Sequence, residues 1–88
     1  MDSYRVTFRP SVEKDLRRLS KDVVARVMAR IKGLEADPLP KQAIKLSGAE
    51  RVYRIRVGDY RIVYEIQTRT KQVLVHYIRH RREVYRAL

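Results

Sequence analysis

Residues 53–66 have the sequence YRIRVGDYRIVYEI, and no other part of this 88-residue chain restricts the fold as strongly. Apolar and polar side chains alternate on both sides of Gly58-Asp59, which predicts two strands joined by a two-residue turn. Glycine allows the positive φ that the first central position of a type II′ turn requires. Counting outward from that turn pairs the apolar residues on a single face: Val57 with Tyr60, Ile55 with Ile62, and Tyr53 with Tyr64.

The same register places basic side chains on the opposite face of the hairpin. Arg56 lies directly across from Arg61, and Arg54 lies across from Val63. Like charges that face each other on a sheet cost about 0.2–1 kcal/mol, so this arrangement needs an explanation. One interpretation is a solvated face that tolerates the repulsion, and the other, which we favour, is a site for an anion.

Length and composition predict one domain over residues 1–88 with a modest core. The chain has no cysteine, so neither a disulfide framework nor a thiolate zinc site is expected. This absence is consistent with a reducing, cytoplasmic location. The first ten residues are charged throughout and contain no apolar segment, so we expect no signal peptide and no transmembrane helix.

The chain carries a formal net charge of +11, and the excess is uneven. Residues 41–88 contain twelve basic and four acidic side chains, against nine and six in residues 1–40. A small domain this basic is expected to bind polyanions, so nucleic acid or an acidic protein is the predicted partner. The basic residues alternate along strands and do not follow one amphipathic helix, so a membrane partner is not expected.

The remaining segments complete a β-α-α-β-β-β order. Residues 3–9 alternate as a strand, Pro10 and the candidate N-cap Ser11 begin a helix, and Ser20 caps a second helix that Asp37-Pro38 is expected to stop. Residues 37–50 are predicted to be a loop, and residues 73–78 a central strand that is followed by a short C-terminal tail or helix. We therefore expect an α+β fold, in which a helical hairpin packs on one face of a small, mostly antiparallel sheet.

The sequence contains few of the residue combinations that enzymes use for catalysis. His76 and His80 are four residues apart, but they fall on or beside a strand without a carboxylate cluster, so no metal site and no cofactor are expected. Arginine and tyrosine side chains suit single-stranded nucleic acid, and RNA can be cleaved without metal because its 2′-OH is an internal nucleophile. Arginine stays protonated, which leaves His80 and Tyr85 as candidates for proton transfer.

The chain also resembles a known family along nearly its whole length. The similarity begins at PSVEKDLRRL, continues through ADPLP and KLSG, and is most specific in YRIRVGDYRIVYEI and HRREVY. These motifs, in this order and spacing, resemble the toxins of the RelE/ParE superfamily, above all the RelE-type ribosome-dependent mRNA interferases. Such toxins belong to type II toxin-antitoxin systems.

The resemblance implies an endoribonuclease that cleaves mRNA in the ribosomal A site by metal-independent 2′-OH attack. It also implies a cognate acidic antitoxin that blocks the basic face, and contact with operator DNA only through the antitoxin complex. The family's functional residues fall on a set of positions that are mostly basic: Arg54, Arg56, Arg61, Arg81 and Tyr85. RelE itself has lysines where this chain has Arg54 and Arg56, so a lysine base is missing here, and His80 is the expected substitute.

Two other functions are compatible with this resemblance. A ParE-like toxin would inhibit gyrase by contact and would have no nuclease activity. A domain of the same fold could also have lost toxicity and serve only as the partner of an antitoxin in operator binding. The basic and tyrosine set favours the nuclease, because ParE-like members generally lack the full set.

Overall fold

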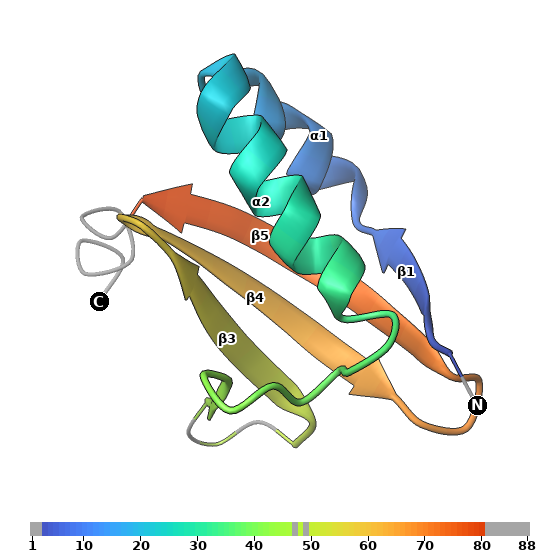
Figure 1. The fold of residues 1–88 in the computed structure, drawn as a ribbon. Helices are drawn as coiled ribbons and strands as arrows, with labels where there is room; N and C mark the ends of the chain where they lie inside the picture. Colours follow the sequence, from blue (N-terminus) through green and yellow to red (C-terminus); the bar gives the residue numbers. More distant parts are fainter. Residues whose placement is uncertain (1–2, 47, 49, 81–88) are drawn as a thin grey trace.

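The computed structural model describes residues 3–46, 48 and 50–80, and Figure 1 shows two helices packed against one sheet. The elements occur in the order β1 (Arg5–Phe8), α1 (Pro10–Arg17), α2 (Lys21–Gly33), β2 (Ile44–Lys45), β3 (Val52–Val57), β4 (Tyr60–Gln67) and β5 (Gln72–His80). This order confirms the predicted α+β class, with β2 as an additional short strand. The predicted tail, residues 81–88, lies outside the described residues.

The five strands form one sheet in the order β1-β5-β4-β3-β2. β1 runs parallel to β5, and the three other pairings are antiparallel, so the sheet is mostly antiparallel as predicted. The helical hairpin connects β1 with the part of the chain that enters β2 and β3 at the other edge (Figure 1). β5 lies between β1 and β4, which confirms the predicted central position of residues 73–78 in the sheet.

The prediction of a continuous loop over residues 37–50 is wrong at Ile44 and Lys45. These two residues form β2 and pair with Arg54 and Tyr53 of β3. Two residues are too few to show an alternating pattern, so the sequence does not reveal this strand. Leu46 follows β2 and is half-buried, and its N–H donates to the carbonyl oxygen of Val52 at 2.9 Å.

The two helices begin in different ways: α2 begins with a side-chain N-cap, and α1 begins with a proline in its first turn. The Ser20 hydroxyl accepts a hydrogen bond from the Val23 N–H at 3.3 Å, which confirms the predicted N-cap of α2. At α1 the predicted cap is wrong, because Arg9 occupies the N-cap position and Pro10 the first turn, where its fixed φ suits a helix. α2 ends at Gly33, before Asp37-Pro38, since its last turn tightens into i→i−3 hydrogen bonds.

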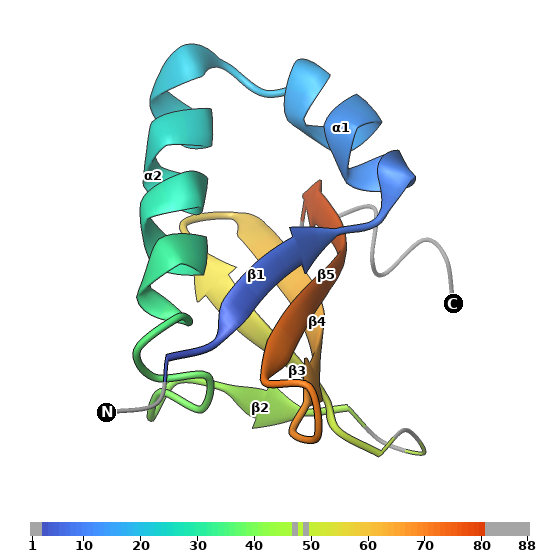
Figure 2. The ribbon, with the colours of Figure 1, turned by 90° about the vertical axis from the view of Figure 1, so that its right-hand side faces the viewer.

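The core lies between the helices and one face of the sheet. We call this side of the sheet the helix face and the opposite side the open face. The core is formed by buried residues of α1, α2, β3, β4 and β5, among them Val12, Val27, Ile31, Ile55, Ile62, Tyr64, Val73, Val75 and Ile78. Figure 2 shows both helices on the same side, and none of the described helices covers the open face.

Helix α1 is also tied to β5 by polar contacts. The Ile78 N–H donates to Asp15 Oδ2 at 3.0 Å, and the Ser11 hydroxyl donates to the His76 carbonyl oxygen at 3.5 Å. Both contacts satisfy backbone groups of β5 beyond Val75, where its pairing with β1 ends. Neither helix of the described chain is long and apolar enough to cross a membrane.

Candidate functional site

The hairpin has the register that its turn predicts. Gly58 has a φ of 57°, and β3 and β4 pair with Arg56 opposite Arg61 and Arg54 opposite Val63. Because strand side chains alternate between faces and Ile55 and Ile62 enter the core, these arginines point to the open face. The Arg56 Nε donates to the Gly58 carbonyl oxygen at 3.3 Å, which ties one arginine to the turn.

Strand β5 extends this arrangement, because Arg79 pairs with Arg61 on the other side of β4. Three arginines, Arg56, Arg61 and Arg79, therefore occupy one cross-strand line on the open face, and we call them the arginine row. Arg61 lies in the middle and is only 8% exposed, whereas Arg56 and Arg79 are exposed. Each opposed pair costs about 0.2–1 kcal/mol through repulsion, and a bound anion would relieve that cost.

A second cross-strand line lies next to the arginine row. In it, Val63 of β4 pairs with Arg54 of β3 on one side and with Tyr77 of β5 on the other. The guanidinium of Arg79 lies over the Tyr77 ring, with its Cζ 4.5 Å from the ring centroid. This cation–π contact holds the planar guanidinium in a defined position next to an aromatic surface. A guanidinium can bind phosphate through two parallel hydrogen bonds, and a ring beside it can stack on a base.

Sequence reasoning missed Arg79 and Tyr77. The predicted strand covers residues 73–78 and is apolar on both faces, so the sequence does not show which face of the sheet Tyr77 lies on. Arg79 falls outside the predicted strand. The buried positions of β5 are Val73, Val75 and Ile78, and their spacing of two and then three residues marks a β-bulge. The irregular spacing of these apolar residues was the one indication of the bulge in the sequence. The bulge places Tyr77 and Arg79 on the open face.

The structure does not bring His80 together with the arginine row. His80 pairs with Tyr60, its ring lies edge-on to the Tyr60 ring at 5.2 Å between centroids, and both belong to the helix face. It borders a hollow of about 200 Å³ between β5 and α1, which Asp15 and Arg18 also line. The two other predicted site residues, Arg81 and Tyr85, lie outside the described residues.

The tyrosines of the hairpin have structural positions, as the alternation predicts. Tyr64 is completely buried, its hydroxyl donates to the Pro38 carbonyl oxygen at 2.7 Å, and its ring centroid lies 6.1 Å from that of Tyr53. Burial, followed by the nearby charge of Asp37 and the neighbouring Tyr53, raises the pKa of Tyr64 to about 12. Its phenol therefore stays protonated and fixes the loop after α2.

Comparison with known proteins agrees with this architecture. Residues 6–85 match the family model described as the ParE toxin of the type II toxin-antitoxin system parDE. RelE1 of Methanocaldococcus jannaschii is 27% identical over 86 residues, which cover 94% of this chain and 96% of the relative.

Two solved complexes contain similar chains. One is the archaeal RelE–RelB complex from Pyrococcus horikoshii, with 32% identity and a TM-score of 0.80 over 90% of this chain and 96% of that chain. The other is the toxin–antitoxin complex RelBE2 from Mycobacterium tuberculosis, with 27% identity and a TM-score of 0.78 over 90% and 99% of the two chains.

Proposed function

The chain belongs to the ParE toxin family of type II toxin–antitoxin systems, within the RelE/ParE superfamily, and we propose that within this superfamily it is a ribosome-dependent endoribonuclease. In this proposal the toxin enters the ribosomal A site and cleaves mRNA by attack of a 2′-OH on the adjacent phosphate. The observation that carries the proposal is the arginine row on the open face. A row of cations beside an aromatic ring suits a single-stranded phosphate backbone.

The arginines contribute binding and charge neutralisation. Arg56 and Arg79 are exposed and can bind the phosphates on either side of Arg61, which is only 8% exposed. In-line attack builds negative charge on the phosphorane oxygens, and preorganised guanidinium groups stabilise that charge more than they stabilise the ground state. Arg54, Arg81 and Tyr85 complete the proposed substrate-binding set, the last as a stacking or orienting residue.

A small acidic antitoxin is the proposed partner that keeps the toxin inactive. The net charge of +11 supports an acidic partner, and both solved structures described above are toxin–antitoxin complexes, RelE–RelB and RelBE2. Operator DNA would be contacted only through that complex. Acidic side chains of an antitoxin that bind over the arginine row would offset the repulsion between its cations, so the antitoxin would both inhibit and stabilise the toxin.

The test is translation-coupled cleavage of mRNA on programmed ribosomes. We expect Arg56→Gln and Arg79→Gln each to lower the single-turnover rate by roughly 10²–10³-fold, the usual loss for one preorganised donor. Arg17→Gln is the matched control, because it removes the same charge from a side chain that is 74% exposed on α1 and pairs with Glu13 one turn away. If both arginine-row variants cleave at the wild-type rate, this function is wrong.

The family model is described as a ParE toxin, which keeps gyrase inhibition as a second candidate. The same purified protein is therefore added to a DNA supercoiling assay. Inhibition of supercoiling with unimpaired translation would identify a ParE-like toxin. Normal growth at confirmed soluble expression without an antitoxin would instead indicate a partner protein without toxicity.

A further inference from the structure

One residue of β5 stands outside the regular pairing with β4. The register passes from Val63 opposite Tyr77 directly to Tyr64 opposite Val75, so His76 is the additional residue of a β-bulge. A bulge lets Val75 and Ile78 both enter the core, and it releases the side chain between them from strict alternation. Bulges of this kind occur often next to active sites, where they re-aim one side chain.

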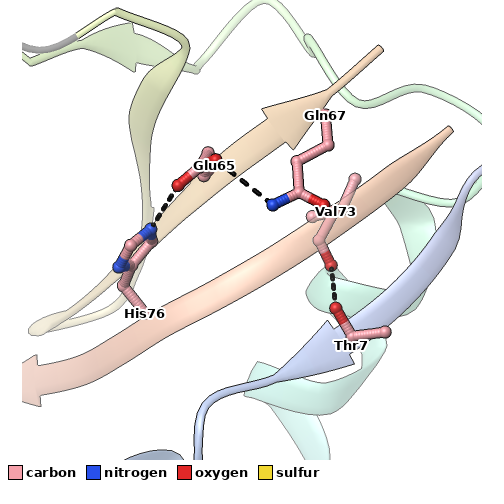
Figure 3. A network of polar contacts seen from close by, with 5 residues as sticks. All are labelled: Thr7, Glu65, Gln67, Val73 and His76. Atoms are coloured by element: carbon pink, nitrogen blue, oxygen red, sulfur yellow. Dashed lines mark hydrogen bonds and ion pairs between the residues drawn. The ribbon is translucent and has the colours of Figure 1, made fainter. Parts of the chain in front are cut away.

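The His76 side chain is held on the open face by a polar network (Figure 3). Its Nε2 lies 3.0 Å from Glu65 Oε1, and the Gln67 side-chain amide donates to Glu65 Oε2 at 3.2 Å. Glu65 lies between the buried residues Tyr64 and Ile66, so it points away from the core. The His76 side chain is 20% exposed, and that of Glu65 is 32% exposed, so both are ordered and still reachable.

This network determines which nitrogen of His76 carries the proton. Hydrogen bonds from Gln67 and His76 hold the pKa of Glu65 below its ordinary value, although partial burial opposes them, and Arg9 adds a smaller favourable charge. An ionised carboxylate only accepts hydrogen bonds, so Nε2 is the donor. The neutral ring then presents Nδ1 as a lone pair, the arrangement that carboxylate-oriented histidines use as general bases.

His76 is also on the correct face for the reaction. Tyr77 follows it on β5, and the Tyr77 ring carries the guanidinium of Arg79, which belongs to the arginine row. The chain has two histidines, and the other one, His80, lies on the helix face beside Tyr60. Of the two rings, only that of His76 shares a face with the proposed phosphate-binding arginines.

We propose that His76, oriented by Glu65, is the general base that removes the proton from the attacking 2′-OH. This inference rests on the proposed nuclease function. The 2′-oxygen forms a bond to phosphorus and the bond from phosphorus to the 5′-oxygen breaks, which leaves a 2′,3′-cyclic phosphate and a 5′-OH. The 2′-OH proton goes to His76 Nδ1, and the leaving 5′-oxygen takes a proton from water. The hydroxide formed from that water takes the proton of the imidazolium, which restores the neutral His76 ring. Glu65 is a positioning residue, and the arginines stay protonated throughout.

The test is the pH dependence of single-turnover mRNA cleavage on programmed ribosomes, across about pH 5–8, where histidine titrates. We expect His76→Gln to lower the plateau rate roughly 10²–10⁴-fold and to abolish the decline on the acidic side. Glu65→Gln should lower the plateau rate less than His76→Gln does, because the base remains and only its positioning carboxylate is lost. His80→Gln is the competing variant, and loss of the acidic decline in His80→Gln but not in His76→Gln would overturn the proposal.

A second measurement does not depend on cleavage. Imidazole ¹⁵N shifts of the isolated protein should show the His76 ring protonated at Nε2 when neutral. An Nδ1–H tautomer would contradict the assignment. A wild-type protein that never cleaves mRNA on ribosomes refutes the proposed function itself, whereas cleavage with a wild-type pH profile in His76→Gln refutes only the role of His76.

Discussion

Gly58→Ala is the substitution that tests most directly how the hairpin is specified. Gly58 has a φ of 57°, a conformation that costs an L-amino acid about 1–2 kcal/mol. The added Cβ would also lie 3.2 Å from Nη2 of Arg26, but this atom is the end of a flexible side chain and can move. We therefore expect a loss of about 1–2 kcal/mol in unfolding free energy, mostly from the backbone.

For a domain of this size, that loss corresponds to a decrease in Tm of about 4–16 °C. Urea unfolding monitored by circular dichroism measures the free energy, and a thermal scan measures the Tm. Gly33→Ala is the matched control, because Gly33 ends α2 and a Cβ there meets no atom within 4 Å. Its stability should be unchanged or raised by up to about 1 kcal/mol.

The Arg26 contact can be separated from the backbone cost by a double-mutant cycle with Arg26→Ala. We expect a coupling energy below about 0.5 kcal/mol, since the guanidinium can swing away. The reasoning is refuted if Gly58→Ala is no less stable than Gly33→Ala. It is also refuted if Arg26→Ala restores most of the loss, because crowding and not the positive φ would then dominate.

Three further predictions follow from single contacts. Burial raises the pKa of Tyr64 to about 12, so its contribution to stability is complete below about pH 10 and is lost at about 1.4 kcal/mol per pH unit between about pH 10 and 12. Urea unfolding of Tyr64→Phe should show a shallower decline over this range. Ser20→Ala should cost about 0.5–2 kcal/mol in urea unfolding, and Ser11→Ala, which removes no helix cap, should cost less. Arg79→Lys keeps the charge but loses the planar contact with Tyr77. Fluorescence anisotropy should therefore show a lower affinity for a short single-stranded RNA, with an unchanged salt dependence of that affinity. Equal affinity of the variant and the wild type would contradict this prediction.

The hairpin register was predictable because two independent features agree on it. The Gly58 turn sets the count, and the apolar alternation of Ile55 and Ile62 selects the same face, so Arg56 opposite Arg61 follows from sequence alone. Ser20 was predictable for a similar reason, because a hydroxyl before an apolar helical stripe has one favourable use. At Ser11 the sequence offered a hydroxyl near the start of the helix but no second feature to fix the first turn, and the predicted N-cap was wrong.

The other half of the site was hidden because long-range pairing decides it. β5 lies next to β4 and β1, and its register depends on both neighbours as well as on an additional residue at His76. Its apolar run predicts burial but not which residues face which side. Arg79 and His80 are adjacent in sequence, and the pairing with Arg61 and Tyr60 sends them to opposite faces.

The bulge at His76 is what allows a strand this apolar to contribute chemistry. Without it, alternation from Val75 would direct Tyr77 and Arg79 to the helix face and would expose Ile78. One additional residue keeps Val75 and Ile78 in the core and gives the open face His76, Tyr77 and Arg79 within four positions. The arginines of the hairpin cannot accept a proton, and its carboxylate Glu65 already accepts hydrogen bonds from Gln67 and His76. The bulged segment of β5 carries a histidine that this carboxylate orients, and we therefore assign the base to His76.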